Sequence, residues 1–506
     1  MPALTLDRRR LLAIGLGAGA VFALPGCGGV ATGAASNRIT WAWQLPTTWD
    51  PVTSSAGSDV QMHALVYEAL TGLDDRGNAV PWLAERWTYN DRGDRVVFTL
   101  KPGLTFSDGN PLDATAVAKS IERGRTQEGS LIAPQLTGIK RVRALSDRDV
   151  VLELHEPDYQ LPLLLAGKTG MVVNPAVFEK DVASLATMPA GSGPFTVTAY
   201  WENDHAEMVA NPRYQLADQI EVEEMWLYAQ PDPATAIASL QSGQYNVVRI
   251  EGAQVEQARQ AGLDVQILDS MYVNVLDVHV GRPPFDQPAV VEAMKYALDR
   301  EQIQKVANFG VGDVNYQPFP KGYVGYNPVL EGIYAYDPDR ARKILADAGL
   351  RTPITGELTD SDQSSAACEV IQAQLKEVGI ELSIDKIPRE QATDLIYVQR
   401  AKALAYDGFA GRESPVQAFQ VLFGAEGLMN PGRRTDPELE AQIAKVRRTP
   451  TDHPDYPALL QEATRIAVTS FPNTFLYDAP RVIARKDVDE LPALKSLQRF
   501  EGVGIG

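Results

Sequence analysis

The residue types that most often carry out chemistry are sparse and scattered in this sequence. The five histidines lie far apart, and no two have the spacing of metal ligands: His63, His155, His205, His279 and His453. No Gly-x-Ser-x-Gly, His-Glu-x-x-His or Cys-x-x-Cys motif is present, so the usual signatures of a hydrolase, a zinc protease and a redox protein are missing. We therefore expect a binding protein rather than a secreted hydrolase, with no catalytic residue, no metal and no cofactor.

One loop carries charges that suit ligand recognition. Residues 406–415, Tyr-Asp-Gly-Phe-Ala-Gly-Arg-Glu-Ser-Pro, place Arg412 and Glu413 side by side after two glycines. If Arg412 faces a binding cleft, its guanidinium favours a carboxylate or another acidic group, held through two parallel hydrogen bonds. The alternative is a solvated loop arginine that pairs with Glu413.

The composition indicates a globular protein of several domains. The chain has 506 residues, of which 44% are hydrophobic and 22% are charged, and a typical domain has about 150 residues. Lys and Arg number 47 against 65 Asp and Glu, so the formal net charge is −18. An acidic chain without a basic block does not attract phosphate backbones, so nucleic-acid binding is not expected.

The first residues have the pattern of an export signal. Residues 7–10, Asp-Arg-Arg-Arg, precede an uncharged run over residues 11–24. As a helix this run spans about 21 Å, short of a hydrocarbon core of about 30 Å. Residues 1–26 are therefore predicted to be a signal peptide. Arg8-Arg9 resembles the twin-arginine motif, but Asp7 replaces its usual Ser or Thr, so the general secretory route stays open.

The apolar run ends at a candidate lipidation site. Leu24-Pro25-Gly26-Cys27 resembles a bacterial lipobox, in which the cysteine carries the lipid and begins the mature protein. Residues 27–37 would then be a lipidated tether. The exported protein would be anchored to the outer face of the cell membrane, or lie in the periplasm as a lipoprotein. The alternative is a plain signal peptide with an incidental cysteine. Lipidation would leave Cys368 without a partner, and its apolar helical surroundings predict a buried free thiol.

Predicted strands and helices alternate over much of the remaining chain. Strands are expected at 38–44, 95–101, 221–229 and 245–251. Helices are expected at 114–124 (with Asp113 as N-cap), 232–242, 288–298, 337–348, 365–378 and 437–447. This alternation is typical of an α/β protein. No internal repeat is visible, and no second apolar run reaches membrane-spanning length.

A series of short motifs carries a family resemblance. In chain order they are residues 79–87 (Ala-Val-Pro-Trp-Leu-Ala-Glu-Arg-Trp), 97–103 and 106–109, then 191–195 and 211–214, then 284–301, and finally 336–349. Together they resemble the family 5 extracellular solute-binding proteins of ABC importers, the peptide, nickel and opine group. The motifs follow the family order from about residue 38 to about residue 480, which covers nearly the whole mature chain.

The resemblance implies an architecture. It predicts an α/β, two-lobed periplasmic-binding-protein fold, type II and cluster C, with an extra subdomain inserted in lobe one. Lobe one would comprise residues 38–55, 185–275 and 476–506; the inserted subdomain residues 56–184; and lobe two residues 276–475. The ligand would bind between the lobes, which close by a hinge motion.

The resemblance also implies a function. The chain would be a monomeric substrate-binding lipoprotein that hands a solute to the permease subunits of an ABC importer. The solute would be a dipeptide or oligopeptide, or alternatively an opine, a sugar or another organic anion. Peptide-binding members hold the peptide amine with an acidic residue before an Asp-Pro pair. Here Ser414-Pro415 replaces that pair and Arg412 takes the acid's place, unless a shift of one residue puts Glu413 there.

Five further residues are candidates for ligand contact. Trp43, Trp49 and Phe409 have rings that stack on ligands, although core filling is the alternative for each of them. Asn274 and Asp277 lie on the strand that the resemblance places at the hinge, close to Tyr272. Ordinary strand pairing is the alternative there.

Overall fold

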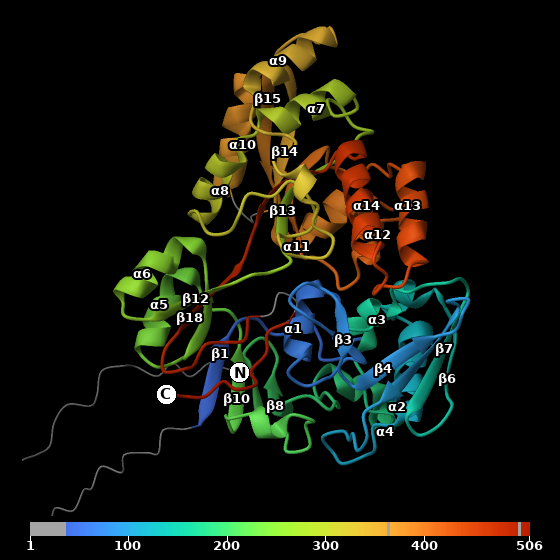
Figure 1. Cartoon of the computed structure of the whole chain (residues 1–506). Helices are drawn as coiled ribbons and strands as arrows, with labels where there is room; N and C mark the ends of the chain where they lie inside the picture. Colours follow the sequence, from blue (N-terminus) through green and yellow to red (C-terminus); the bar gives the residue numbers. More distant parts are fainter. Residues whose placement is uncertain (1–36, 362–364, 494–496) are drawn as a thin grey trace, which may run out of the picture. The chain divides into compact units, whose positions relative to one another are not determined.

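The computed structural model describes residues 37–361, 365–493 and 497–506. Its strands form sheets of seven, five, four and two strands (Figure 1). The predicted signal peptide and the candidate lipidation site Cys27 lie outside the described residues. No helix within the described ranges is long and apolar enough to cross a membrane.

The seven-stranded sheet joins the beginning, the middle and the end of the chain. In sheet order its strands are β12 (Asp264–Leu268), β18 (Arg481–Arg485), β11 (Val247–Ile250), β1 (Arg38–Ala42), β10 (Glu224–Tyr228), β9 (His205–Ala210) and β8 (Phe195–Trp201). β1 runs parallel to β10 and β11, whereas β18 runs antiparallel to β11 and β12. The ends of β1 and β11 and the start of β18 therefore lie at one edge of this sheet.

Alternation along the strands separates the two faces of this sheet. Ile39 and Trp41 of β1 are fully buried in the main core of lobe one. Part of the other face is covered by α5 (Pro233–Gln241) and α6 (Val255–Gln260), whose apolar residues pack on Val248 and Val482. This is the period of two expected for strands that are buried on both faces.

The five-stranded sheet is the centre of lobe two. In sheet order its strands are β15 (Ile380–Lys386), β14 (Ile354–Asp360), β16 (Leu404–Phe409), β13 (Val273–Val278) and β17 (Thr474–Asp478). Separate hydrophobic cores lie on its two faces. Their helices are α7 (Pro288–Ala297), α8 (Arg300–Asn308), α9 (Pro338–Asp347), α10 (Ser365–Glu377), α12 (Pro415–Phe423), α13 (Pro437–Arg447) and α14 (Tyr456–Ser470). Cys368 of α10 is free and fully buried, which confirms the predicted buried thiol.

The four-stranded sheet is antiparallel throughout. Its order is β4 (Ala84–Tyr89), β5 (Arg95–Leu100), β7 (Asp149–Leu154) and β6 (Ile139–Ala144), and α2 (Ala114–Thr126) packs against it. Asp113 accepts a hydrogen bond from the backbone N–H of Ala116 at 2.8 Å, so the predicted N-cap is confirmed. The small hairpin is formed by β2 (Thr71–Leu73) and β3 (Ala79–Pro81).

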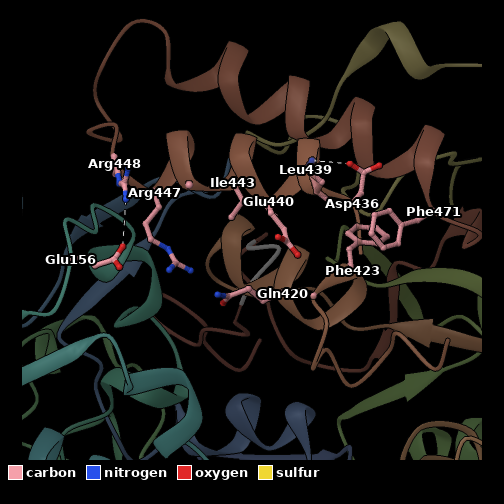
Figure 2. A pocket seen from close by; sticks show the side chains of 12 residues that line it. Glu156, Gln420, Phe423, Asp436, Leu439, Glu440, Ile443, Arg447, Arg448 and Phe471 are labelled. Atoms are coloured by element: carbon pink, nitrogen blue, oxygen red, sulfur yellow. Dashed lines mark hydrogen bonds and ion pairs between the residues drawn. The ribbon is translucent and has the colours of Figure 1, made fainter. Parts of the chain in front are cut away.

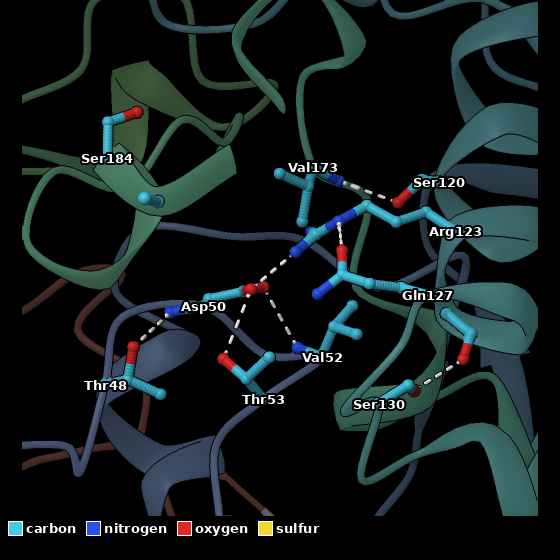
Figure 3. A network of polar contacts seen from close by, with 12 residues as sticks. Thr48, Asp50, Val52, Thr53, Ser120, Arg123, Gln127, Ser130, Val173 and Ser184 are labelled. Carbon is cyan, nitrogen blue, oxygen red and sulfur yellow. Dashed lines mark hydrogen bonds and ion pairs between the residues drawn. The ribbon is translucent and has the colours of Figure 1, made fainter. Parts of the chain in front are cut away.

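A buried ion pair fixes the loop that leads into this part of the chain. Arg123 of α2 contacts the carboxylate of Asp50 and donates to Gln127 at 2.6 Å (Figure 3). Asp50 also accepts from the backbone N–H of Val52 at 3.1 Å. Both charged groups are almost fully buried, and their contact links α2 to the loop at residues 48–54.

The predicted elements agree with the structure. Each strand and helix expected from the sequence is present, with ends that move by at most a few residues. Two short segments, residues 269–272 and 479–480, connect the seven-stranded and five-stranded sheets. The lobe limits drawn from the sequence, at residues 275 and 476, fall inside β13 and β17.

Candidate functional site

The two connecting segments bind to each other at the junction of the lobes. The backbone N–H of Ala479 donates to the carbonyl of Tyr272 at 2.9 Å, and the Ser270 hydroxyl donates to the carbonyl of Ala479 at 2.7 Å. The Tyr272 ring lies directly over Gly408, where a Cβ would overlap it. Gly408 is therefore required because the Tyr272 ring occupies the space that a Cβ would need.

Charged groups surround the Tyr272 hydroxyl. Burial raises the pKa of Tyr272, and the Asp407 carboxylate raises it further, whereas Arg389 and Arg249 lower it. Burial also lowers the pKa of Arg481 to about 10, and the charge of Arg249 lowers it further. Arg249, Arg389 and Arg481, called here the arginine group, therefore gather positive charge at the junction of a chain whose net charge is −18.

The fold explains how the arginine group assembles. Arg249 lies in β11 and Arg481 begins β18, at the edge of the seven-stranded sheet where β1 and β11 end. Arg389 begins the short helix α11 (Arg389–Ala392), just after β15 of the five-stranded sheet. The group therefore contains side chains from both lobes.

The guanidinium of Arg249 is available to bind an anion. The Arg249 side chain is exposed, and the protein around it lowers its pKa. Its guanidinium lies 5.6 Å from the centre of the Trp43 ring. The Arg249 backbone carbonyl accepts from Gln230 at 2.8 Å, but among the described residues its guanidinium has no hydrogen bond and no ion pair. A cation that lies beside two others is stabilised when an anion binds.

A second charged group lies where lobe two meets the inserted subdomain. Lys168 donates to the carbonyl of Ser54 at 2.8 Å, and burial lowers its pKa against the opposing effects of Asp59 and Glu413. Asp59 accepts from the Ser54 hydroxyl at 2.7 Å. The Glu413 side chain packs against Gly167, across the boundary from its own loop. The loop that carries Arg412 and Glu413 therefore touches the inserted subdomain.

Arg412 is half-buried in this second group. Its guanidinium donates to the carbonyl of Gly411 at 2.5 Å and lies 5.4 Å from the centre of the Phe409 ring. Burial lowers the pKa of Arg412, and the neighbouring Glu413 opposes that shift. The structure thus places Arg412 and Glu413 at a lobe boundary, with Lys168 as a third charged neighbour.

The remaining candidates from the sequence occupy different surroundings. Trp49 and Phe409 are fully buried in hydrophobic cores, whereas Trp43 is buried beside Arg249. Asn274 is buried and accepts a hydrogen bond from the Tyr406 hydroxyl at 3.0 Å. Of these residues, Trp43 alone neighbours the arginine group.

Asp277 lies behind the junction in a buried polar triad. The Tyr397 hydroxyl is 2.6 Å from one Asp277 carboxylate oxygen and 2.5 Å from a carboxylate oxygen of Asp407. The other Asp277 oxygen accepts from the Asn473 amide at 2.7 Å. Burial, reinforced by the charge of Asp407, raises the pKa of Asp277 to about 7.

Sequence reasoning missed the arginine group. In β11 the signal was Arg249 itself, a single charge within the apolar run Val247-Val248-Arg249-Ile250. Arg481 and Arg389 gave no comparable signal, because their positions matter only once strand ends from distant parts of the chain meet. Among the described residues no group of three or more His, Cys, Asp or Glu side chains is arranged to hold a metal ion.

A cavity of about 190 Å³ lies elsewhere, beside α12 and α13 (Figure 2). Phe423, Leu439 and Ile443 give it apolar walls, and none of its lining residues belongs to either charged group. Next to it Arg448 is 3.6 Å from Glu156 of the inserted subdomain. The cavity therefore marks a contact between lobe two and the inserted subdomain, apart from the charged junction.

Comparison with known proteins gives consistent results. The model of the bacterial extracellular solute-binding proteins, family 5, matches residues 78–427. A glutathione-binding protein of Pectobacterium atrosepticum is 24% identical over 479 residues, which cover 92% of this chain and 91% of that protein. The counterpart in Escherichia coli K12 is 26% identical over 389 residues, covering 75% of this chain and 73% of that protein.

Solved structures share the fold. A dipeptide-binding protein of a Pseudoalteromonas species, in complex with Met-Leu, has a TM-score of 0.78 at 19% identity and covers 93% of this chain and 100% of its own. The binding protein AgaA of A. tumefaciens, in complex with agropinic acid, has a TM-score of 0.77 at 20% identity, with coverages of 91% and 95%. The two-lobed α/β fold expected from the sequence is thereby confirmed.

Proposed function

Because this chain belongs to the bacterial extracellular solute-binding proteins, family 5, we propose that it captures a short peptide with more than one carboxylate. The observation that carries the proposal is the arginine group beside Tyr272, above all Arg249, whose guanidinium makes no hydrogen bond and no ion pair among the described residues. Peptide carboxylates accept paired hydrogen bonds from guanidinium groups and offset the repulsion among them.

Ligand binding would couple to lobe closure because the arginines come from both lobes. Arg249 and Arg481 belong to the seven-stranded sheet, whereas Arg389 follows the five-stranded sheet. A ligand anion that contacts both sets would bind the closed arrangement more tightly than the open one, and so shift the population toward it. The permease subunits of an ABC importer would then receive the solute from the closed form, with no covalent step in this chain.

The relatives support a peptide as the solute. Several of the similar proteins are named for glutathione binding, and one of the similar structures holds the dipeptide Met-Leu. Glutathione is a tripeptide with two carboxylates, which suits a site with several arginines. If Arg412, rather than Glu413, stands at the place where peptide-binding members have an acid, it also favours an acidic rather than a cationic ligand group.

A non-peptide organic anion is the second candidate. The similar structure of AgaA holds agropinic acid, and the arginine group would serve an opine carboxylate as well as a peptide carboxylate. The two candidate ligands differ in the part of the molecule beyond the carboxylate, which the arginines do not contact.

Calorimetry on the purified chain tests the proposal. We expect glutathione, or a dipeptide that contains glutamate, to bind at least about tenfold more tightly than neutral Met-Leu, and Arg249→Ala to remove that preference. The matched control is Arg351→Ala, because Arg351 is exposed and precedes β14, at the opposite end of that strand from the junction. Equal affinity for Met-Leu, unchanged in Arg249→Ala, would contradict the proposal. Tight binding of agropinic acid alone would favour the second candidate.

We also propose that the exported chain is a monomer anchored by lipid at Cys27. The support is the apolar run that ends at Cys27, followed by small residues suited to a tether. Cys27→Ser should move the protein from the membrane fraction to the soluble fraction. Recovery of the variant in the membrane fraction, in the same proportion as the wild-type chain, would reject the anchor.

A further inference from the structure

One tyrosine hydroxyl contacts two carboxylates behind the arginine group. The Tyr397 oxygen lies 2.6 Å from Asp277 and 2.5 Å from Asp407. A hydroxyl has a single proton, so it donates to one carboxylate only, and the other contact requires a proton on the carboxyl group itself. When both contacts are made, the triad therefore holds one proton more than two carboxylates and a tyrosine would ordinarily carry at neutral pH.

The surroundings show where that proton resides. Asp277 is 1% exposed, whereas Asp407 is half-buried and also accepts from the backbone N–H of Gly408 at 2.7 Å. Burial penalises the charged form more strongly at Asp277, in agreement with its pKa of about 7. Protonated Asp277 thus donates to Tyr397, and Tyr397 donates to Asp407.

We propose that Asp277 and Tyr397 are positioning residues for ligand binding, which hold Asp407 beside Tyr272 through this shared proton. Loss of the proton adds a negative charge behind the arginine group and leaves two carboxylates competing for one hydroxyl. An anionic ligand therefore binds less tightly as the pH rises through neutrality. This step rests on the proposed anionic ligand, whereas the shared proton itself does not.

Among the residues that the structure describes, no basic side chain contacts Asp277 directly. The titratable groups that face Asp277 are Tyr397 and Asp407, and Asn473 faces its other oxygen. Within the described ranges Asp277 has no ion pair with a basic residue. Farther out, Tyr272 faces Asp407, and Arg249 and Arg389 face Tyr272. The added negative charge therefore changes the electrostatic potential at the arginine group.

The first experiment measures glutathione affinity against pH for the wild-type chain and Asp277→Asn. The new amide of that variant donates to Tyr397 and accepts from Asn473, so it preserves the protonated arrangement and the fold. We expect wild-type affinity to fall by about tenfold between about pH 6 and about pH 8, and the variant to show no such fall. A variant with the wild-type slope overturns the proposal.

A matched control tests whether the effect depends on the position of Asp277 or only on a buried carboxyl group with a raised pKa. Glu68 is also buried, and burial raises its pKa to about 7, but its neighbours Gln215, Ser192, Arg499 and Lys101 belong to neither the triad nor the arginine group. Glu68→Gln should keep the wild-type pH dependence of affinity. A flattened profile in Glu68→Gln would overturn the assignment to Asp277.

Infrared spectroscopy tests the shared proton without a ligand. In a Glu68→Gln background, we expect a carboxylic-acid carbonyl band that disappears as the pH rises through neutrality and that is absent in Asp277→Asn. A band that titrates identically in Asp277→Asn overturns the proposal. If the band behaves as expected but the wild-type chain binds no glutathione, the proposed ligand class is wrong while the shared proton stands.

Discussion

Two of the regions where positive charge gathers in this molecule are built differently. In the core of lobe two, buried Lys295 donates to the carbonyls of Phe471 at 2.7 Å and Val468 at 3.3 Å. Arg300 beside it donates to the carbonyls of Phe475 and Tyr334, both at 2.9 Å. At the junction, Arg249 has no such acceptor among the described residues.

This difference in hydrogen bonding distinguishes Lys295, a structural cation, from Arg249, a cation suited to ligand binding. The donors of Lys295 meet carbonyls at the end of α14, where the helix dipole also favours a positive group. A buried polar group that the chain itself satisfies needs nothing from outside. The Arg249 guanidinium makes no hydrogen bond or ion pair among the described residues, so its donors are available to an external anion.

The largest expected effect is on ligand affinity at the junction. Arg249→Ala should weaken glutathione binding by about 2–5 kcal/mol, on the scale of truncating one partner of a desolvated charge pair. Lys295→Met should leave affinity unchanged, because the carbonyls around Lys295 belong to the core. Calorimetry on both variants measures the contrast. Equal losses in the two variants would show that the two regions do not differ in the way described.

The second expected effect distinguishes the two neighbours in the loop after β16. Arg412→Ala should weaken binding by at least about 2 kcal/mol if its half-buried guanidinium contacts a ligand acid. Glu413→Ala should cost under about 1 kcal/mol, as for a partly solvated ion pair. Isothermal titration of both variants decides the order. The reverse order would shift the loop register by one residue and favour recognition of a peptide amine.

A third expected effect concerns the stability of lobe two. Burial lowers the pKa of Lys295 to about 7 from 10.5, so the folded state binds this proton less tightly than the unfolded state does. The free energy of unfolding should therefore fall as the pH decreases from about 10 to about 7, by about 3–4 kcal/mol relative to Lys295→Met.

Urea unfolding at several pH values measures this difference. Arg249→Ala is the comparison variant, because a guanidinium stays protonated over this range and its removal should not change the slope. A Lys295→Met variant that retains the full wild-type slope would show that the Lys295 amine is not what titrates.

The elements were predictable because each depends on neighbours in sequence. Helix α13 was expected at residues 437–447 and lies there, and Asp113 was expected as an N-cap and is one. Apolar periodicity, turn residues and caps act over a few positions, so a single sequence contains them. The motif series added the order of the lobes, which local patterns do not provide.

The candidate site was only partly predictable, because it depends on which strand ends meet. Arg412 and Glu413 were found through the loop pattern, whereas Arg249 and Arg481 come together through the β11–β18 pairing of distant segments. Asp277 looked like a ligand contact on a hinge strand, but its partners Tyr397 and Asn473 are far away in sequence. Whether a polar side chain faces a ligand or a buried partner is a property of tertiary packing.

The smallest expected effect is no change at all, and it tests whether the affinity losses are local. Cys368 is buried between α10 and the five-stranded sheet, and burial raises the pKa of its thiol to about 12. Thiol reagents attack the thiolate, so both inaccessibility and the raised pKa protect it. In a Cys27→Ser background Cys368 is the single thiol. It should react after unfolding in urea but not in the native chain, and equally slowly in Arg249→Ala. Faster native labelling in Arg249→Ala would mean that the substitution loosens lobe two, and the loss of affinity would then not measure a contact with the ligand.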